Sequence, residues 1–335
     1  LPQLESVRMR RKAVERGIPL FTSLDTANAL ANALTSRYSL GNVELVDINN
    51  MRTKHKKLTF TKMRGTGNDY LYFDCFDQTV ESPESLAVRL SNRRTGVGSD
   101  GIVLIMPSTI ADAKMRMFNA DGTEGSVAGN ALRCVCKYLY ENGHVRKDEM
   151  AVETGSGVKT AKLFIREDQV FSVLVDMGCP AFAPAKIPVK LDGDRVMMRP
   201  VFLAGEKREI SCVSMGNPHV VIFVEDVNRI PLEQVGPQIE TDSLFPERVN
   251  VSFAQIVDKN DIVMRVWERG IGETAACGTG ACAVAVAAVE NGFCTRGADI
   301  DVRLPGGTLV VRYQEDGKVW LTGDANTDFT GTIEI

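Results

Sequence analysis

The sequence predicts an α+β protein with two pseudo-symmetric domains. Each domain is expected to be a mixed, mainly antiparallel sheet wrapped around a central helix, with the active site in the cleft between the two. The first supporting observation is a segment that occurs twice, since Met115–Gly143 and Met264–Gly292 align without a gap at a constant offset of 149 residues. The second is that each copy has one apolar helical stretch among short strand-like runs. Self-similarity at a fixed distance indicates that one structural unit was duplicated.

The two copies share many residues and differ at one position that matters chemically. The identical aligned pairs include Met115/Met264, Arg116/Arg265, Glu124/Glu273, Gly129/Gly278, Val135/Val284, Glu141/Glu290, Asn142/Asn291 and Gly143/Gly292. At the turn before the helix, the second copy has Cys277 and the first has Ala128. A function for this protein must therefore explain a thiol on one side of a two-fold site and a methyl group on the other.

The expected elements follow the same order in both copies. In the first copy, strands, Gly-rich turns and one helix are expected over 58–75, 89–106, 114–124, 128–142 and 152–178. In the second copy they are expected over 209–226, 248–257, 261–270, 277–290 and 301–325. The predicted domains are 1–56 as a fragment and linker, 57–175 plus 324–335 as the N-terminal domain, and 176–323 as the C-terminal domain.

Composition argues against a nucleic-acid-binding, membrane-spanning, secreted or metal-binding protein. Charged residues make up 24% of the 335-residue chain, and the net charge of −4 gives no reason to expect a nucleic acid or an anionic membrane as partner. Neither a membrane span nor a signal peptide is expected, because no apolar run is long enough. The eight cysteines and three histidines lack metal-site spacing, so we expect no metal and a reduced, cytoplasmic protein. Because the sequence begins with Leu1, it is expected to be a fragment or a processed product.

Cys277 is the main candidate for chemistry. It stands at the start of a helix in Ala-Cys-Gly-Thr-Gly, where the positive end of the helix dipole stabilises a thiolate. The bare backbone N–H groups of Gly278 and Thr279 are suited to hold a carboxylate or an enolate-like oxyanion. The alternative is a buried structural cysteine beside a tight turn, and the Gly-Thr-Gly flank favours the functional interpretation.

Further polar candidates stand at strand ends. Four asparagines lie in or next to turns and are expected to point toward the same cleft, namely Asn68, Asn119, Asn217 and Asn250. Each could instead be an ordinary turn residue, and it is their recurrence in two copies that favours binding of a zwitterionic amino acid. Glu268 and Arg269 align with Asn119 and Ala120 of the other copy. They are candidates for binding the ammonium and carboxylate groups of the substrate. His219 could tune the pKa of the Cys277 thiol, or it could be a structural side chain.

At these residues the chain resembles diaminopimelate epimerase. The matching segments run in family order from Leu58 to the C-terminus, and they are Gly67–Tyr70, Arg94–Gly101, Phe118–Gly122, Gly216–His219, Arg248–Asn250, Glu268–Gly270 and Ala276–Gly280. The resemblance implies the inversion of LL-2,6-diaminopimelate to the meso form without a cofactor, by two cysteines on opposite faces of the α-carbon. It implies that the substrate is held by Asn68, Asn119, Gly129, Asn130, Asn217, Asn250, Glu268, Arg269, Gly278 and Thr279. A homodimer is a further option.

The chain departs from this family at Ala128, where the second cysteine is expected. Alanine cannot shuttle a proton, and Cys134 lies six residues further along the helix, about 9 Å of rise away. The leading hypothesis is an epimerase that uses Cys277 on one face and water or another acid on the other. The alternatives are a one-base amino-acid isomerase or eliminase, a non-catalytic amino-acid-binding protein, and an engineered Cys→Ala trap. The intact Cys277 turn argues against a pure binding protein.

The first 50 residues form a separate piece. They resemble the last third of the methylglyoxal-synthase-like regulatory domain that ends the carbamoyl phosphate synthetase large chain. The strands needed to complete a parallel sheet are absent, so this piece is not expected to bury a core by itself. A gene-fusion remnant is favoured over a working regulatory module, and the polar stretch Asn49–Lys57 is expected to be a linker.

Overall fold

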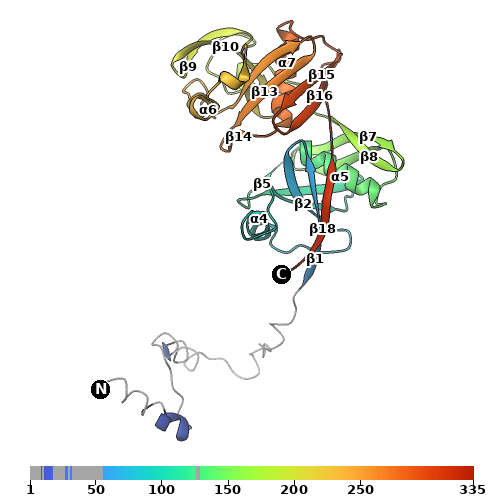
Figure 1. Cartoon of the computed structure of the whole chain (residues 1–335), viewed down its shortest axis with the longest axis vertical. Helices are drawn as coiled ribbons and strands as arrows, with labels where there is room; N and C mark the ends of the chain where they lie inside the picture. Colours follow the sequence, from blue (N-terminus) through green and yellow to red (C-terminus); the bar gives the residue numbers. More distant parts are fainter. Residues whose placement is uncertain (1–8, 10, 18–26, 29–30, 32–55, 126–128) are drawn as a thin grey trace. The chain divides into compact units, whose positions relative to one another are not determined.

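The computed structural model describes residues 9, 11–17, 27–28, 31, 56–125 and 129–335 (Figure 1). The chain divides into two compact units, Leu1–Lys56 and Lys57–Ile335. In the first unit residues 11–15 are helical, and most of the predicted fragment lies outside the described residues. The boundaries predicted inside the second unit stay a prediction.

The duplication seen in the sequence is present in the order of elements. The first copy consists of β1 (Lys57–Gly65), β2 (Asn68–Asp74), α4 (Pro83–Ser91), β3 (Gly101–Met106), β4 (Ala113–Asn119), β5 (Glu124–Gly125), α5 (Gly129–Glu141), β6 (Glu149–Thr154), β7 (Gly157–Arg166) and β8 (Gln169–Asp176). The second consists of β10 (Glu206–Ser214), β11 (Pro218–Phe223), α6 (Leu232–Glu240), β12 (Asn250–Asp258), β13 (Asp261–Glu268), β14 (Gly272–Thr274), α7 (Gly278–Glu290), β15 (Asp299–Leu304), β16 (Gly307–Tyr313) and β17 (Val319–Gly323). The 149-residue offset relates both ends of α5 and α7, of α4 and α6, and of β1 and β10.

Strand pairing is the same in both copies. In the first, β1 and β2 are antiparallel, β2 is parallel to β3, β3 is antiparallel to β4, and β4 is parallel to β6. In the second, β10, β11, β12, β13 and β15 repeat these relations in turn. Antiparallel ladders then join β6, β7 and β8, and likewise β15, β16 and β17. The predicted mixed, mainly antiparallel sheets are therefore confirmed.

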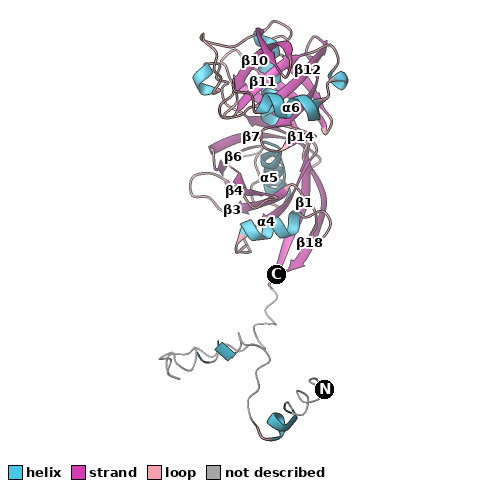
Figure 2. Ribbon diagram, turned by 90° about the vertical axis from the view of Figure 1, so that its left-hand side faces the viewer, coloured by secondary structure: helices cyan, strands magenta, loops and turns pink. Residues whose placement is uncertain are grey.

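The central helices α5 and α7 are the ones predicted, and strands surround α5 in Figure 2. Every residue of α7 from Gly280 to Ala288 is buried. A helix that is apolar on all sides must lie in a core. Its small side chains allow the surrounding sheet to approach closely. The α7 residues form one hydrophobic core with strand residues such as Val266 and Leu309. Leu132, Val135 and Leu139 of α5 belong to the corresponding cluster of the first copy.

The shorter helices cover the other side of each sheet. Leu86 and Leu90 of α4 pack with Phe73 and Phe118 in one cluster. Ile239 of α6 belongs to a separate cluster in the second copy. Each copy thus has one core around its long helix and another beneath its short helix. The remaining described elements are β9 (Arg199–Leu203), the short 3-10 helices Pro184–Lys186 and Val227–Arg229, and β18 (Asn326–Glu334).

Two ladders connect the copies. Strand β17 pairs with β8, for example Leu321 with Val175. The last strand, β18, returns to the first copy and pairs antiparallel with β1, as Figure 1 shows. Between these ladders lies Arg133 of α5, a fully buried guanidinium that donates to the backbone carbonyl of Asp324 at 3.0 Å and to Thr66 Oγ1 at 2.8 Å. This arginine therefore fixes the segment where the chain leaves one copy and re-enters the other.

The segment around Arg133 leaves no room for a larger residue at Gly323. A Cβ at Gly323 would lie 2.7 Å from Arg133 Cζ and 2.7 Å from Leu309 Cδ2. Gly323→Ala is expected to lower the free energy of unfolding by about 1–3 kcal/mol, the usual cost of overpacking. Chemical denaturation measures it, and Gly125→Ala, whose Cβ would have the flexible Met117 side chain as its nearest neighbour at 3.3 Å, is the control. A change below about 0.5 kcal/mol for Gly323→Ala would contradict the described packing.

Among the described residues, no helix is long and apolar enough to cross a membrane. All eight cysteines are described, and none forms a disulfide.

Candidate active site

Cys277 is the residue that caps the start of α7, as the sequence predicts. Its backbone is extended, with φ −138° and ψ 108°, and the helix begins at Gly278. The side chain is 5% exposed, and Sγ lies 3.6 Å from Thr279 Oγ1. A Cβ at Gly280 would lie 3.3 Å from Sγ, so the glycine gives the sulfur its space. The sequence therefore places the thiol at a helix start and next to a hydroxyl.

The net effect of the surroundings on this thiol differs from the expectation. Burial is the largest influence and raises the pKa of Cys277, and the negative charge of Glu268 raises it further. The Thr279 hydroxyl and the Gly280 N–H lower the pKa, and they are outweighed. Burial and Glu268 therefore raise the pKa of Cys277 by more than the donors at the helix start lower it. The helix start supplies its donors, but desolvation of the charged form exceeds their effect.

A chain of hydrogen bonds leads from a buried histidine to the sulfur. His219 is fully buried, and burial lowers its pKa to about 3, so the ring is neutral. Its Nε2 lies 3.0 Å from Asn217 Oδ1, which can only accept, so Nε2 carries the proton. Asn217 Nδ2 donates to Thr279 Oγ1 at 3.2 Å, and Thr279 Oγ1 lies 3.6 Å from Cys277 Sγ, a contact in which either group can donate. His219 thus acts on the thiol through Asn217 and Thr279.

Glu268 is the acidic group beside the thiol. It is the last residue of β13, and its Oε1 accepts a 2.6 Å hydrogen bond from Thr274 Oγ1. Burial raises the pKa of Glu268, the hydrogen bonds from Thr274 and Cys277 lower it, and the charge of Asp100 raises it. A carboxyl group whose pKa is raised beside a thiol is a suitable partner for proton exchange and for binding an ammonium.

The first copy contributes a matching amide cluster. Asn68 stands at the start of β2, and its Oδ1 accepts from Asn130 Nδ2 at 2.6 Å. Asn68 Nδ2 donates to Asp100 Oδ2 at 3.1 Å. This repeats the second copy, where the equivalent turn amide of Asn217 bonds to Thr279 on the helix. In both copies the turn before the second strand is therefore tied to the first turn of the central helix.

The two clusters meet at the helix starts. A Cβ at Gly278 would lie 3.7 Å from Asn130 Oδ1, and this oxygen is buried without a partner among the described residues. The charge of Asp100 raises the pKa of Glu268. Burial raises the pKa of the Tyr70 phenol, and the charges of Asp100 and Glu268 raise it further. Residues from the two copies thus combine in one polar site around the thiol.

Two of the predicted asparagines have different surroundings. Asn250 is 4% exposed, donates to the Pro218 carbonyl and accepts from the Arg269 backbone N–H. Asn119 donates to Thr123 Oγ1 within its own turn at 2.9 Å. The hydrogen bonds of both side chains shape the loops that carry Arg269 and the turn after β4. Their direct contact with a substrate stays a prediction.

Of the remaining predicted residues, those that the structure describes stand at a helix start or in an exposed loop. Ala128 lies outside the described residues, and Gly129 is the first residue of α5. The Arg269 guanidinium is exposed and donates to the Glu247 carbonyl at 3.0 Å. Asp100 and Thr274 were not predicted as site residues. The sequence signal for Asp100 is its place in the matching segment Arg94–Gly101, and its contacts with Asn68 and Asp69 come from the structure.

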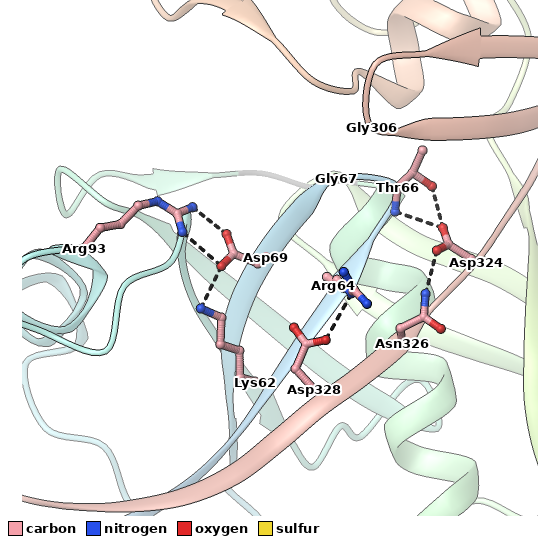
Figure 3. A pocket seen from close by; sticks show the side chains of 10 residues that line it. All are labelled: Lys62, Arg64, Thr66, Gly67, Asp69, Arg93, Gly306, Asp324, Asn326 and Asp328. Atoms are coloured by element: carbon pink, nitrogen blue, oxygen red, sulfur yellow. Dashed lines mark hydrogen bonds and ion pairs between the residues drawn. The ribbon is translucent and has the colours of Figure 1, made fainter.

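A cavity of about 550 Å³ lies beside Gly67 and Asp69 (Figure 3). It is lined by Lys62, Arg64, Thr66, Gly67, Asp69, Arg93, Gly306, Asp324, Asn326 and Asp328. Its charged groups neutralise one another, with Lys62 and Arg93 both on Asp69 and Arg64 on Asp328. Cys277 is not in its wall, so this cavity is not the place of the chemistry. No cluster of potential metal ligands occurs in the part of the chain that the structure describes.

Alkylation tests the charge state of Cys277. Because a raised pKa leaves less thiolate at every pH below it, iodoacetamide should modify Cys277 about tenfold faster per pH unit between about pH 7 and 10. Mass spectrometry of the Cys277 peptide measures this slope, with the exposed Cys179 as internal reference. Steric shielding lowers the rate without changing the slope. A plateau below pH 9.0, the ordinary value for the thiol, would show that the helix start dominates after all.

The chain is similar in sequence to a known protein family and to individual members of it. The diaminopimelate epimerase family matches residues 60–183 and 211–327. A diaminopimelate epimerase of Acetivibrio thermocellus is 48% identical over 279 residues, covering 83% of this chain and 99% of the relative. One of Desulfovibrio desulfuricans is 50% identical over 285 residues, with coverage of 83% and 99%.

Solved structures with lower identity share the fold. A phenazine biosynthesis protein of the PhzF family from Bacillus anthracis superimposes with a TM-score of 0.62 at 18% identity, covering 84% of this chain and 100% of that one. A hydroxyproline epimerase from Agrobacterium vitis gives a TM-score of 0.54 at 16% identity, with coverage of 84% and 93%. Together with the sequence relatives and the duplicated architecture, these findings show that the chain belongs to the diaminopimelate epimerase family.

Proposed function

We propose that residues 57–335 invert LL-2,6-diaminopimelate to meso-diaminopimelate without a cofactor, with Cys277 as the thiol on one face of the α-carbon. The observation that carries this proposal is the position of Cys277 at the start of α7, between a donor, Thr279, and an acidic group, Glu268. A thiol held in this way exchanges one proton with carbon, as thiolate when it removes the proton and as thiol when it returns it.

Substrate binding is expected to change the state of the thiol. The negative charge of Glu268 is one cause of the raised pKa of Cys277. An ammonium group bound beside Glu268 cancels that charge, and it therefore lowers the pKa of Cys277 when the substrate arrives. The donors from Thr279 and Gly280 then act on a sulfur that is closer to a thiolate. In this way the substrate itself helps to activate the base.

The remaining residues have roles in binding. Backbone N–H groups at Gly129, Gly278 and Thr279 stand at helix starts and stabilise the charge that develops on the substrate carboxylate. The unpartnered Asn130 Oδ1 is an acceptor suited to an ammonium. Asn68 and Asn217 hold these two helix starts in place. Asn119, Asn250 and Arg269 complete the proposed substrate site.

Inversion needs a second proton transfer on the opposite face. In the proposed reaction, the α-proton leaves on one side of the α-carbon and another is added on the other side, so that the net number of protons is unchanged. Cys277 serves one side. Ala128 has no acidic proton, and water or another acid serves the side where the family resemblance implies a second thiol.

Proton exchange in D2O tests this proposal. The protein is incubated with LL-diaminopimelate, and both the α-C–H signal in NMR and the stereoisomer ratio are followed. Loss of the α-C–H signal together with inversion is the expected result. Exchange without inversion would indicate a one-base enzyme and overturn the proposed epimerase. The absence of exchange would indicate a protein that only binds amino acids.

A further inference from the structure

Glu240 is a buried carboxylate outside the proposed catalytic set. It is the last residue of α6 and is 5% exposed. Its Oε2 accepts from the indole Nε1 of Trp267 at 2.7 Å, and its Oε1 accepts from the backbone N–H of Gly270 at 2.9 Å. Arg248 Nη1 lies 3.5 Å from Oε1. Burying a carboxylate costs free energy unless hydrogen-bond donors satisfy its oxygens. Glu240 is buried with two such donors and a guanidinium beside it, so the groups that these bonds hold in place indicate its role.

The donors bound by Glu240 bracket the loop that carries the charged pair. Trp267 comes immediately before Glu268, and Gly270 comes immediately after Arg269. The two bonds therefore hold the Trp267 side chain on one side of Glu268 and Arg269 and the Gly270 backbone on the other. The contact with α6 is close, because a Cβ at Gly236 would lie 2.6 Å from Trp267 Cδ2. The loop has little freedom to shift relative to this helix.

The first copy has no such carboxylate. The position equivalent to Glu240 is Ser91, whose hydroxyl bonds to Ser99 Oγ at 3.1 Å. The position equivalent to Trp267 is Phe118, which has no hydrogen-bond donor in its ring. The carboxylate and the indole thus occur only in the copy that carries Glu268 and Arg269 in place of Asn119 and Ala120. Their co-occurrence links Glu240 to the charged pair and not to the fold in general.

We propose that Glu240 is a positioning residue that sets the Glu268–Arg269 loop for binding the charged groups of the substrate. This inference rests on the proposed function, because it concerns the same site. Glu240 does not touch the reacting atoms. It acts through Trp267 and the Gly270 N–H, so its loss should weaken binding more than the proton transfer at Cys277.

Glu240→Gln tests this role. The variant keeps the volume of the side chain but replaces one acceptor oxygen by an NH2 group, so one of the two loop bonds is lost. We expect KM for LL-diaminopimelate, and Kd from calorimetry, to rise at least about tenfold, while kcat changes less than about threefold. Ser91→Ala, at the equivalent place of the first copy, should change KM less than about twofold.

Two outcomes would overturn the proposal. One is a Glu240→Gln variant with unchanged KM and Kd, and the other is a loss of kcat at unchanged KM. If Glu240→Gln does not fold, Trp267→Phe removes the indole donor alone and should raise KM about threefold, and an unchanged KM there also rejects the role. Failure of the proposed function is seen separately, because the parent protein would then bind LL-diaminopimelate without inverting it. Lack of binding by the parent would reject both.

Discussion

Replacing Cys277 with alanine is expected to lower the rate of α-proton exchange from LL-diaminopimelate about 10³-fold or more. This thiol is the group placed to move the proton, and general acid–base groups contribute about 10²–10⁴-fold to such reactions. The protein should still fold and bind, because the lost side chain is small and the turn is held by the Asn217–Thr279 bond. Exchange is measured by NMR in D2O, and Kd for the unreacted substrate by calorimetry.

Cys179→Ala is the matched control for Cys277→Ala, because it removes an exposed thiol that is not among the proposed site residues. Cys277→Ser adds a second comparison, since a hydroxyl keeps the shape of the thiol but is a far weaker acid. Undiminished exchange in Cys277→Ala would mean that another group moves the proton. The proposed mechanism would then be wrong even if the protein were an epimerase.

Ala128→Cys is expected to raise the rate of inversion at least tenfold, the scale on which a restored acid–base group acts. The prediction comes from the repeat, in which Ala128 aligns with Cys277 at the 149-residue offset. With a thiol on each face, one sulfur removes the α-proton and the other returns a proton. The stereoisomer ratio measured against time gives the rate.

Two companion variants sharpen the Ala128→Cys test. Ala128→Ser adds a polar group of similar size that is a poor acid, and it should leave the rate within about twofold. The double variant Ala128→Cys with Cys277→Ala moves the thiol of the proposed site to the other face and should lose the gain. If Ala128→Cys inverts no faster than the parent, residue 128 is not the second proton-transfer position.

The long helices and the order of strands were predictable from the sequence because their signals are local and repeated. The runs at 128–142 and 277–290 are apolar and end at Gly143 and Gly292, and the structure forms α5 and α7 there. The short helices α4 and α6 were missed. Each spans nine residues and contains a proline, either at its start or inside it, which suppresses the helical signal.

The sequence could predict where Cys277, Asn68 and Asn217 stand in the fold, but not the electrostatics around the thiol. The turn residues Asn68 and Asn217 and the capping position of Cys277 follow from the motif. The sign of the net pKa shift at Cys277 does not, because it depends on burial and on Glu268, nine residues earlier in the chain. Asn250 could not be separated from a ligand-binding amide by sequence either, since its partners Pro218 and Arg269 come from other strands and loops.

The return of the last strand to the first copy has a consequence for the order in which the nascent chain can fold. Residues 57–64 form the ladder partner of 326–334, so one edge of β1 has no partner strand until residues 326–334 have left the ribosome. Strands β10 to β17 come from one continuous stretch, and their mutual ladders are available earlier. During translation, the copy that is synthesised first is therefore the one whose sheet is completed last.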